Sequence, residues 1–334
     1  MVHNLGIMNL QYNSDYIFKI GFNHFWSGFD NRNNFITRLF EYSKIPFEIV
    51  DSEYGHLDIL IESSFNASDT PEIFLFNAIK HYLINRLNIN IFGKHNQLVD
   101  KVMYRKTNSP FRIYYTGENV RAPNNYDLSL SFDVDDPYLC NFYYPLIYDT
   151  LLSSKMSVKD EIFGSVIPFD YLTAPRPYAN IGKRKLACIF INNHQPFRER
   201  LIREFSRYGQ VDVFGKAYGN FIDRKSDLFG EYKYVLCPEN DFYPGYVTEK
   251  IVHAFALGSI PVYWGSNENI KFLNKNSFIA INPYISLSKQ IEIFCSSSQK
   301  DVEKVYRQPL ILEEPGWDDI TRSLLERMIN FEKR

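Results

Sequence analysis

One stretch, residues 232–266, constrains the fold more than any other part of the chain. It reads YKYVLCPENDFYPGYVTEKIVHAFALGSIPVYWGS. Its pattern predicts a strand at 232–237, a loop at 238–246, a helix from about Thr248 and a second strand at 260–264. A strand, helix and strand in this order pack on a parallel sheet, and the first loop lies at the edge where α/β proteins bind ligands. The stretch therefore predicts an α/β fold with a ligand site in this loop.

The start of the helix in this stretch favours a negatively charged ligand. A helix N-terminus presents unpaired N–H groups and a partial positive charge, and Lys250 adds a full charge in the first turn. A phosphorylated ligand is therefore the first hypothesis.

The length of the chain and a repeated alternation of strands and helices predict two domains. A chain of 334 residues is long for a single hydrophobic core. In the first half, strand patterns lie at 16–22, 47–50, 57–61, 111–115 and 126–132, and helical patterns at 33–44 and 74–87. The chain then becomes irregular after residue 145, and a proline-rich segment at 167–185 is a predicted linker.

A second alternating pattern follows this segment. It has strands at 186–191 and 211–214, a helix at 197–208, and then the opening stretch. We expect two Rossmann-like, doubly wound domains facing a cleft, at residues 1–165 and 166–315. Residues 316–334 form an amphipathic helix that either packs back on the N-terminal domain or caps its own.

Composition excludes several other classes of protein. The formal net charge of -2 provides no field that would attract nucleic acid. The four cysteines are far apart, so neither a zinc site nor a disulfide framework is expected. The N-terminus lacks the pattern of a signal peptide, and no stretch has the roughly 18 to 20 apolar residues of a membrane span. A cytoplasmic protein without a transmembrane segment is expected.

Three segments resemble the α-1,3-fucosyltransferases, glycosyltransferase family 10. Residues 238–266 resemble the donor-binding motif of this family, which reads roughly FEN, then YPGYVTEK, then PVYWG. Residues 114–119 read YYTGEN, and residues 191–198, which read INNHQPFR, precede the donor motif as in the family. Here Pro238 stands where the family often has Phe, and no heptad repeat or basic amphipathic tail for membrane attachment is visible. Of the two kinds of membrane association, the sequence therefore leaves peripheral contact as an alternative and predicts no transmembrane segment.

The resemblance implies a fold of the GT-B type, with an N-terminal acceptor domain and a C-terminal domain for GDP-fucose. It also implies inverting transfer of fucose to the 3-hydroxyl of N-acetylglucosamine in a lactosamine-type glycan. GDP-fucose and an oligosaccharide or glycoconjugate acceptor are the expected partners. No cofactor is required, although stimulation by a divalent cation stays open.

The resemblance assigns roles to six residues. Glu118 is the expected general base, which takes the proton from the acceptor hydroxyl. Arg198 and Lys250 supply positive charge to the diphosphate and replace a metal ion there. The other expected donor contacts are Glu249, to the ribose hydroxyls, and Asn240 and Tyr246, to the nucleotide or sugar.

Simpler interpretations stand beside these assignments. Glu118 could cap a turn, and Tyr246 could be a core aromatic residue. Residues 133–136, which read DVDD, match the Asp-x-Asp metal site of other glycosyltransferases but are more typical of a solvated loop, so no metal is assigned. Trp26 and Phe29 could stack on the acceptor sugar or belong to the core.

Two alternative functions follow from the same pattern. A GT-B transferase could use another nucleotide sugar, and a non-catalytic glycan-binding protein could share the fold. The dense donor motif argues against the first alternative, and the presence of Glu118 argues against the second, because a binding protein needs no base.

Overall fold

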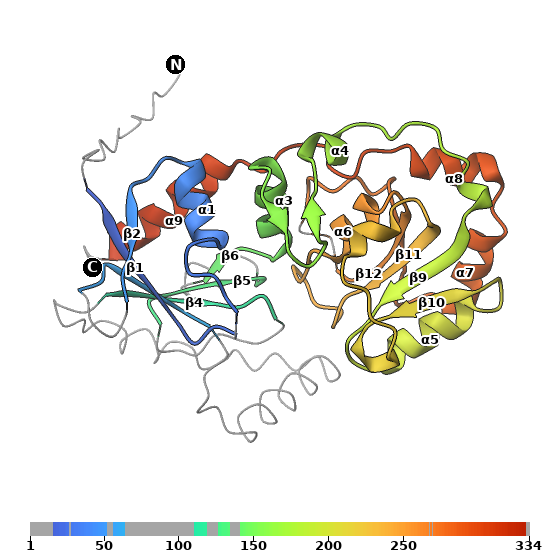
Figure 1. Cartoon of the computed structure of the whole chain (residues 1–334), viewed down its shortest axis with the longest axis horizontal. Coiled ribbons are helices and arrows are strands. Elements are labelled where there is room, and N and C mark those ends of the chain that lie inside the picture. The colour runs from blue at the N-terminus through green and yellow to red at the C-terminus, as the bar shows by residue number, and fades with distance from the viewer. Residues whose placement is uncertain are drawn as a thin grey trace, which may run out of the picture. The chain divides into compact units, whose positions relative to one another are not determined.

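The computed structural model of the chain describes residues 16–26, 28–51, 56–63, 110–118, 126–133, 141–266, 268 and 270–331. By their contacts, the residues divide into two compact units (Figure 1). The first unit comprises Met1–Tyr115, Ala122–Ser129 and Trp317–Arg334, and the second comprises Thr116–Arg121 and Leu130–Gly316. This division differs from the expected ranges 1–165 and 166–315. The helix expected at 74–87 lies outside the described residues.

The first sheet has the strand order β2-β1-β3-β4-β5-β6. Its strands are β1 (Phe18–Asn23), β2 (Phe47–Ile49), β3 (Ile59–Glu62), β4 (Phe111–Tyr115), β5 (Leu128–Ser131) and β6 (Asn141–Tyr143). β1 pairs in parallel with β2 and β3, and β3 pairs in parallel with β4. Ile20, Ile61 and Ile113 of these strands are buried. The five strands predicted for this half are confirmed, with small shifts of their ends.

Helices α1 (Phe35–Tyr42) and α9 (Trp317–Phe331) pack together in the first unit. α1 begins after Asn34 because the side chain of Asn34 accepts hydrogen bonds from the backbone N–H groups of Ile36 and Thr37. α9 buries Trp317, Leu324 and Leu325. Their spacing of seven and eight residues places these three side chains on one face of the helix.

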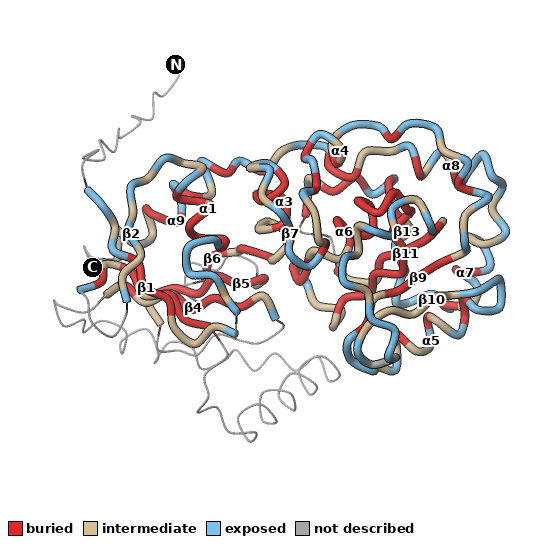
Figure 2. Tube along the Cα trace, in the orientation of Figure 1, coloured by how far each residue is buried: buried red, intermediate tan, exposed pale blue. Residues whose placement is uncertain are grey.

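The second sheet is parallel and has the order β10-β9-β11-β12-β13. Its strands are β9 (Lys185–Phe190), β10 (Val211–Phe214), β11 (Tyr232–Pro238), β12 (Ile260–Trp264) and β13 (Ile279–Ala280). Figure 2 shows that β9 and β11 are largely buried. The predicted order of strand, loop, helix and strand at 232–266 is confirmed.

Helices cover both faces of this second sheet. They are α5 (Pro196–Phe205), α6 (Lys250–Ala256), α7 (Leu287–Cys295) and α8 (Gln299–Tyr306). Buried side chains of α5, α7 and α8 share one core cluster with strands β9, β11 and β12. α6 contacts β11 and β12 with residues outside that cluster, so it covers the other face. The second unit is therefore doubly wound, as the sequence predicts. Three short 3-10 helices complete this part: η3 (Ile181–Lys183), η4 (Lys216–Tyr218) and η5 (Lys225–Leu228).

The segment expected to be irregular and then a linker is largely ordered, so both expectations were wrong. It contains α3 (Ile147–Lys155), an antiparallel pair of β7 (Lys159–Asp160) and β8 (Ser165–Val166), and α4 (Phe169–Thr173). Within the predicted linker, Arg176 is only 1% exposed. Its guanidinium lies between the rings of Phe255 and Tyr306, at 3.9 and 4.1 Å from their centroids. It also donates to the carbonyl of Ser259 at 2.8 Å, so it holds this segment against α6 and α8.

Candidate functional site

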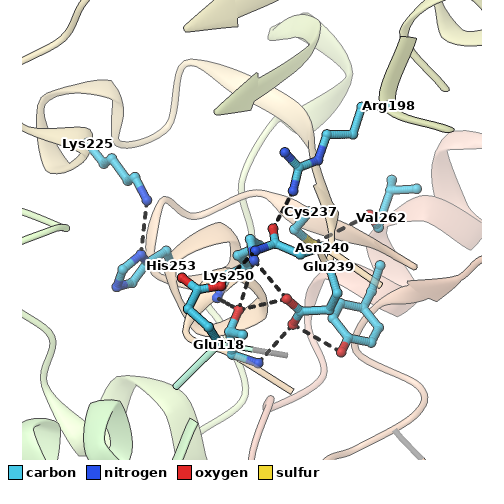
Figure 3. Close-up of polar contacts among 11 residues, drawn as sticks. Glu118, Arg198, Lys225, Cys237, Glu239, Asn240, Lys250, His253 and Val262 are labelled. Atoms are coloured by element: carbon cyan, nitrogen blue, oxygen red, sulfur yellow. Dashed lines mark hydrogen bonds and ion pairs between the residues drawn. The ribbon is translucent and has the colours of Figure 1, made fainter. Parts of the chain in front are cut away.

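A buried carboxylate organises the loop that follows β11. Glu239 comes directly after this strand, and its backbone N–H donates to the carbonyl of Trp264 at 2.8 Å. Its side chain is completely buried. It accepts hydrogen bonds from the Thr248 backbone N–H and hydroxyl at 2.8 Å each, from Lys250 Nζ at 2.8 Å and from the Tyr263 hydroxyl at 3.2 Å (Figure 3). These bonds tie the start of α6 to the ends of β11 and β12.

Lys250 is the first residue of α6, two residues later than the predicted helix start. Thr248, before the helix, donates both its backbone N–H and its hydroxyl to Glu239. Lys250 Nζ donates to Glu239 Oε2 at 2.8 Å and to Thr248 Oγ1 at 3.2 Å. Burial lowers the pKa of Lys250, but the nearby carboxylates of Glu239 and Glu249 outweigh burial, so the pKa lies above its ordinary value. Lys250 is therefore a fixed cation at neutral pH.

Asn240 joins a second cation to a second carboxylate. Arg198, in the first turns of α5, donates from Nη2 to Asn240 Oδ1. Asn240 Nδ2 in turn donates to Glu118 Oε2 at 3.2 Å (Figure 3). The two contacts require the same orientation of the amide, because a guanidinium can only donate and a carboxylate can only accept. The backbone carbonyl of Asn193 also accepts from Arg198, at 3.2 Å.

Glu118 lies in a tight turn after β4 and belongs to the second unit, together with the other candidate residues. Its backbone N–H donates to Thr116 Oγ1 at 3.2 Å, and the Thr116 hydroxyl donates to the Glu118 carbonyl at 2.8 Å. The side chain stays exposed. Desolvation of the carboxyl group nevertheless raises its pKa, although Lys250 and Asn240 act in the opposite direction. The carboxylate is thus a stronger proton acceptor than an ordinary glutamate.

Glu249 and Tyr246 also lie close to this cluster. Burial raises the pKa of Glu249. The electrostatic influence of Lys250, His253 and Lys225 lowers this pKa by more than burial raises it, so it lies below its ordinary value. The ring of Tyr246 is buried against Phe132, with ring centroids 5.0 Å apart. Glu118, Glu249 and Arg198 are within electrostatic reach of its hydroxyl. The structure therefore brings together all six residues that the resemblance singled out.

The structure adds three residues that the sequence did not indicate. His253 of α6 contacts Asp160 Oδ2 through Nε2 at 2.8 Å. Lys225 Nζ lies 3.3 Å from His253 Nδ1 (Figure 3). A carboxylate can only accept, so the Nε2–H group of His253 donates to Asp160. Lys225 is in a charged stretch and His253 in an apolar helix, and neither position carries a sequence signal that could have revealed the contact.

The structure locates parts of two further candidate features, the DVDD run and the pair Trp26 and Phe29, whose roles stay predictions. Asp133 Oδ1 accepts a hydrogen bond from the Tyr243 hydroxyl at 3.1 Å, and the rest of the DVDD run lies outside the described residues. Across the part of the chain that is described, no group of three or more His, Cys, Asp or Glu residues could hold a metal ion. In the first unit, Phe29 stacks on Phe25 with centroids 3.9 Å apart, while Trp26 is 44% exposed.

The arrangement combines the chemistry needed to bind and cleave a phosphorylated ligand. Arg198 and Lys250 are cations that suit phosphate oxygens, and Glu249 offers acceptors for hydroxyl groups. Glu118 supplies a carboxylate of raised pKa, and the side-chain amide of Asn240 connects it to Arg198 by hydrogen bonds. Because α6 is only seven residues long, the interpretation as a phosphate-binding site depends more on these side chains than on the helix N-terminus.

Comparison with known proteins finds a family match over residues 181–306, a range that includes Arg198, Asn240, Tyr246, Glu249 and Lys250 but not Glu118. Residues 181–306 match the model of the family described as glycosyltransferase family 10 (fucosyltransferase) C-term. The chain is 28% identical over 253 residues to the alpha-(1,3)-fucosyltransferase FucT of Helicobacter pylori, covering 65% of this chain and 52% of that protein. It is 31% identical over 132 residues to human 4-galactosyl-N-acetylglucosaminide 3-alpha-L-fucosyltransferase 9, covering 37% of each. The chain thus spans about half or less of the length of these relatives.

Solved structures show the same fold. A crystal structure of an alpha1,3-fucosyltransferase with GDP matches with a TM-score of 0.64 and 18% identity, covering 98% of this chain and 94% of that chain. A structure of an alpha1,3-fucosyltransferase with GDP-fucose matches with a TM-score of 0.63 and 18% identity, covering 93% and 90%. The two-domain α/β fold of the GT-B type is thereby confirmed. Within the described residues, no helix is both long enough and apolar enough to span a membrane.

Proposed function

We propose that the chain is an α-1,3-fucosyltransferase, because residues 181–306 match the model described as glycosyltransferase family 10 (fucosyltransferase) C-term. In this proposal it moves fucose from GDP-fucose to the N-acetylglucosamine of a lactosamine-type glycan, with inversion at the anomeric carbon. One observation carries the proposal. The hydrogen-bonded series of Arg198, Asn240 and Glu118 joins a phosphate-binding cation to a carboxylate of raised pKa.

Arg198 and Lys250 bind the diphosphate in this mechanism. Negative charge develops on the leaving nucleoside diphosphate as its bond to fucose breaks, and fixed cations stabilise that charge in the transition state. Arg198 is 5% exposed and is oriented by Asn240 and by the Asn193 carbonyl, so little motion is needed when the donor binds. Two cations of this kind supply the charge that a metal ion supplies in other transferases, and stimulation by a divalent cation is compatible with them.

Glu118 acts as the general base. It removes the proton from the acceptor hydroxyl while that oxygen attacks the anomeric carbon from the side opposite the diphosphate. A base is most effective when its pKa approaches the working pH, and desolvation moves the pKa of Glu118 in that direction. Asn240 holds the carboxylate through its amide nitrogen. Loss of Asn240 would therefore disturb both the base and Arg198.

The remaining donor contacts follow from charge and burial. Glu249 accepts hydrogen bonds from the ribose hydroxyls, because its lowered pKa keeps it ionised. Tyr246 contributes a hydroxyl beside Glu118 and Arg198 while its ring packs in the core. The assignment of acceptor binding to residues 1–165 and donor binding to 166–315 stays a prediction, and so does the cytoplasmic location.

Donor binding tests this proposal directly. Isothermal titration of the purified protein with GDP-fucose, GDP and UDP-glucose should give binding by the first two and at least about tenfold weaker binding by the third. The Arg198→Gln variant should bind both GDP-fucose and GDP more weakly than the wild type, because the cation that faces the phosphates is lost. As a matched control, Arg203→Gln changes an arginine of α5 outside the site and should leave binding unchanged. Equal affinity for UDP-glucose and GDP-fucose would contradict the donor assignment.

A further inference from the structure

The buried carboxylate of Glu239 is not among the residues that contact substrate in the proposed function. Its two oxygens accept hydrogen bonds from four donors: the Thr248 N–H and hydroxyl, Lys250 Nζ and the Tyr263 hydroxyl. A carboxylate has about four lone-pair positions, so its hydrogen-bonding capacity is filled. A fully buried group of this kind has one orientation, and it imposes that orientation on its partners.

Among these partners, Lys250 is the residue that binds the diphosphate in the proposed function. Its ammonium group has three N–H bonds. Glu239 Oε2 and Thr248 Oγ1 accept two of them, at 2.8 and 3.2 Å, and among the described residues no other acceptor bonds to this group. The lysine side chain is 23% exposed. One N–H bond therefore remains for a ligand oxygen, in a direction that the other two bonds define.

A glycine of the same motif leaves room for this arrangement. A Cβ atom on Gly265 would lie 2.5 Å from the Tyr263 hydroxyl and 2.8 Å from Glu239 Cγ. Both distances are too short for a real contact. The backbone of Gly265 does not have the positive φ that favours glycine, so the space taken by Glu239 and Tyr263 is what requires a glycine here.

We propose that Glu239 is a positioning residue for the donor diphosphate: it acts through Lys250, whose free N–H bond it directs, and Gly265 provides the space for it. This inference rests on the proposed function. Glu239 touches no substrate in it. Its role is to keep Lys250 both charged and oriented.

The substitution Glu239→Gln separates charge from shape. The glutamine side chain keeps the size of glutamate, but its amide nitrogen is a donor and cannot accept from Lys250 or Thr248. Lys250 would then lose its nearest carboxylate. The other charged groups that influence it are Glu249 at the N-cap of α6, Arg198 on α5, Glu118 and Lys225. Burial lowers the pKa of Lys250, so without Glu239 the ammonium should lose its proton at lower pH than in the wild type.

The test is GDP binding by isothermal titration between about pH 7 and pH 10, a range that approaches the ordinary lysine pKa. Glu239→Gln should bind GDP at least about tenfold more weakly at neutral pH. Its affinity should also begin to fall at lower pH than that of the wild type. Glu204→Gln, the same substitution at a buried glutamate of α5 that pairs with Arg207, should match the wild type in affinity and pH profile. Gly265→Ala should weaken GDP binding as well, because it displaces the carboxylate.

The outcomes distinguish this inference from the proposed function. If the wild type does not bind GDP, the proposed function fails. If the wild type binds and Glu239→Gln has the same affinity and pH profile, Glu239 does not position Lys250. Weaker binding with an unchanged pH profile would reduce Glu239 to a structural role and would also overturn the inference. If Glu239→Gln does not fold, Gly265→Ala decides, and wild-type GDP affinity in that variant would contradict the inference.

Discussion

Glu118 is the residue whose chemistry is easiest to isolate. Its backbone is fixed by Thr116 and its side chain by Asn240, so an amide at this position should leave the fold intact. Glu118→Gln should lower kcat for fucose transfer at least about 100-fold, since general bases typically contribute that much. GDP affinity should stay within about twofold of the wild type, because the proposed phosphate contacts come from other residues. Single-turnover kinetics with GDP-fucose, together with GDP titration, measure both quantities.

The control for this experiment is Glu231→Gln, which changes an exposed glutamate that pairs with Lys185 at 3.6 Å. It should leave both kcat and GDP affinity unchanged. Full transfer activity in the Glu118→Gln variant would show that another group removes the proton.

Asp160 links stability to pH through His253. Burial raises the pKa of Asp160, but its charge and hydrogen-bond contacts with His253, with smaller contributions from Phe163 N–H and Lys225, lower the pKa to about 2. The folded pKa is thus below the unfolded one. The contribution to stability, about 2 kcal/mol, is present above roughly pH 4 and is lost as the pH falls toward 2.

Urea unfolding of the wild type and of Asp160→Asn over this pH range tests the link. Asparagine can still accept from the Phe163 N–H, which Asp160 binds at 2.8 Å, so the charge is the main change. The wild type should be more stable at pH 6, and the difference should shrink as the pH approaches 2. A difference that is independent of pH would show that His253 does not shift the pKa of Asp160.

At the scale of elements, the cap of α1 offers a defined test. Asn34 is 4% exposed, and its Oδ1 accepts from the backbone N–H groups of Ile36 and Thr37 at 3.1 and 3.2 Å. The Thr37 hydroxyl oxygen accepts from the Asn34 N–H at 2.9 Å, which completes a capping box. Asn34→Ala should lower the free energy of unfolding by about 1 kcal/mol. Denaturant unfolding measures the change.

The neighbouring Asn33 provides the matched control. It is exposed, and its side chain accepts a hydrogen bond from Arg38 Nε at 3.1 Å. Asn33→Ala should therefore change stability by less than about 0.5 kcal/mol. Equal losses in the two variants would mean that the cap does not stabilise α1.

Strands such as β11 and β12 were predictable from the sequence because they are buried along almost their whole length and so read as short apolar runs bounded by turn residues. α3 was not predictable, because it is buried on most sides and so has no apolar stripe. Ser153 and Ser154 lie inside it and donate to carbonyls one turn earlier, at 2.7 and 3.0 Å. The predicted linker was wrong for a related reason. An arginine between prolines resembles an exposed position, and only the structure shows that Arg176 is enclosed by two rings.

At the scale of the whole molecule, the resemblance predicted residues that lie close together in the candidate site, but it did not predict the contacts that support them. Glu118, Arg198 and Lys250 follow from the resemblance, since each lies in a segment with a recognisable pattern. Asp160, Lys225 and His253 come from three separate segments and meet only in the folded second unit. No local pattern could indicate this contact. The same holds for the four donors of Glu239, of which three come from Thr248 and Lys250 at the start of α6 and one from Tyr263 in β12.

Transfer of fucose is the most direct test of the central claim. The purified chain is incubated with GDP-fucose and N-acetyllactosamine, and the products are analysed by mass spectrometry and by determination of the linkage. We expect release of GDP and addition of one deoxyhexose to the 3-hydroxyl of N-acetylglucosamine, with inversion at the fucose anomeric carbon. Binding of GDP-fucose without transfer to any lactosamine-type acceptor would contradict this expectation.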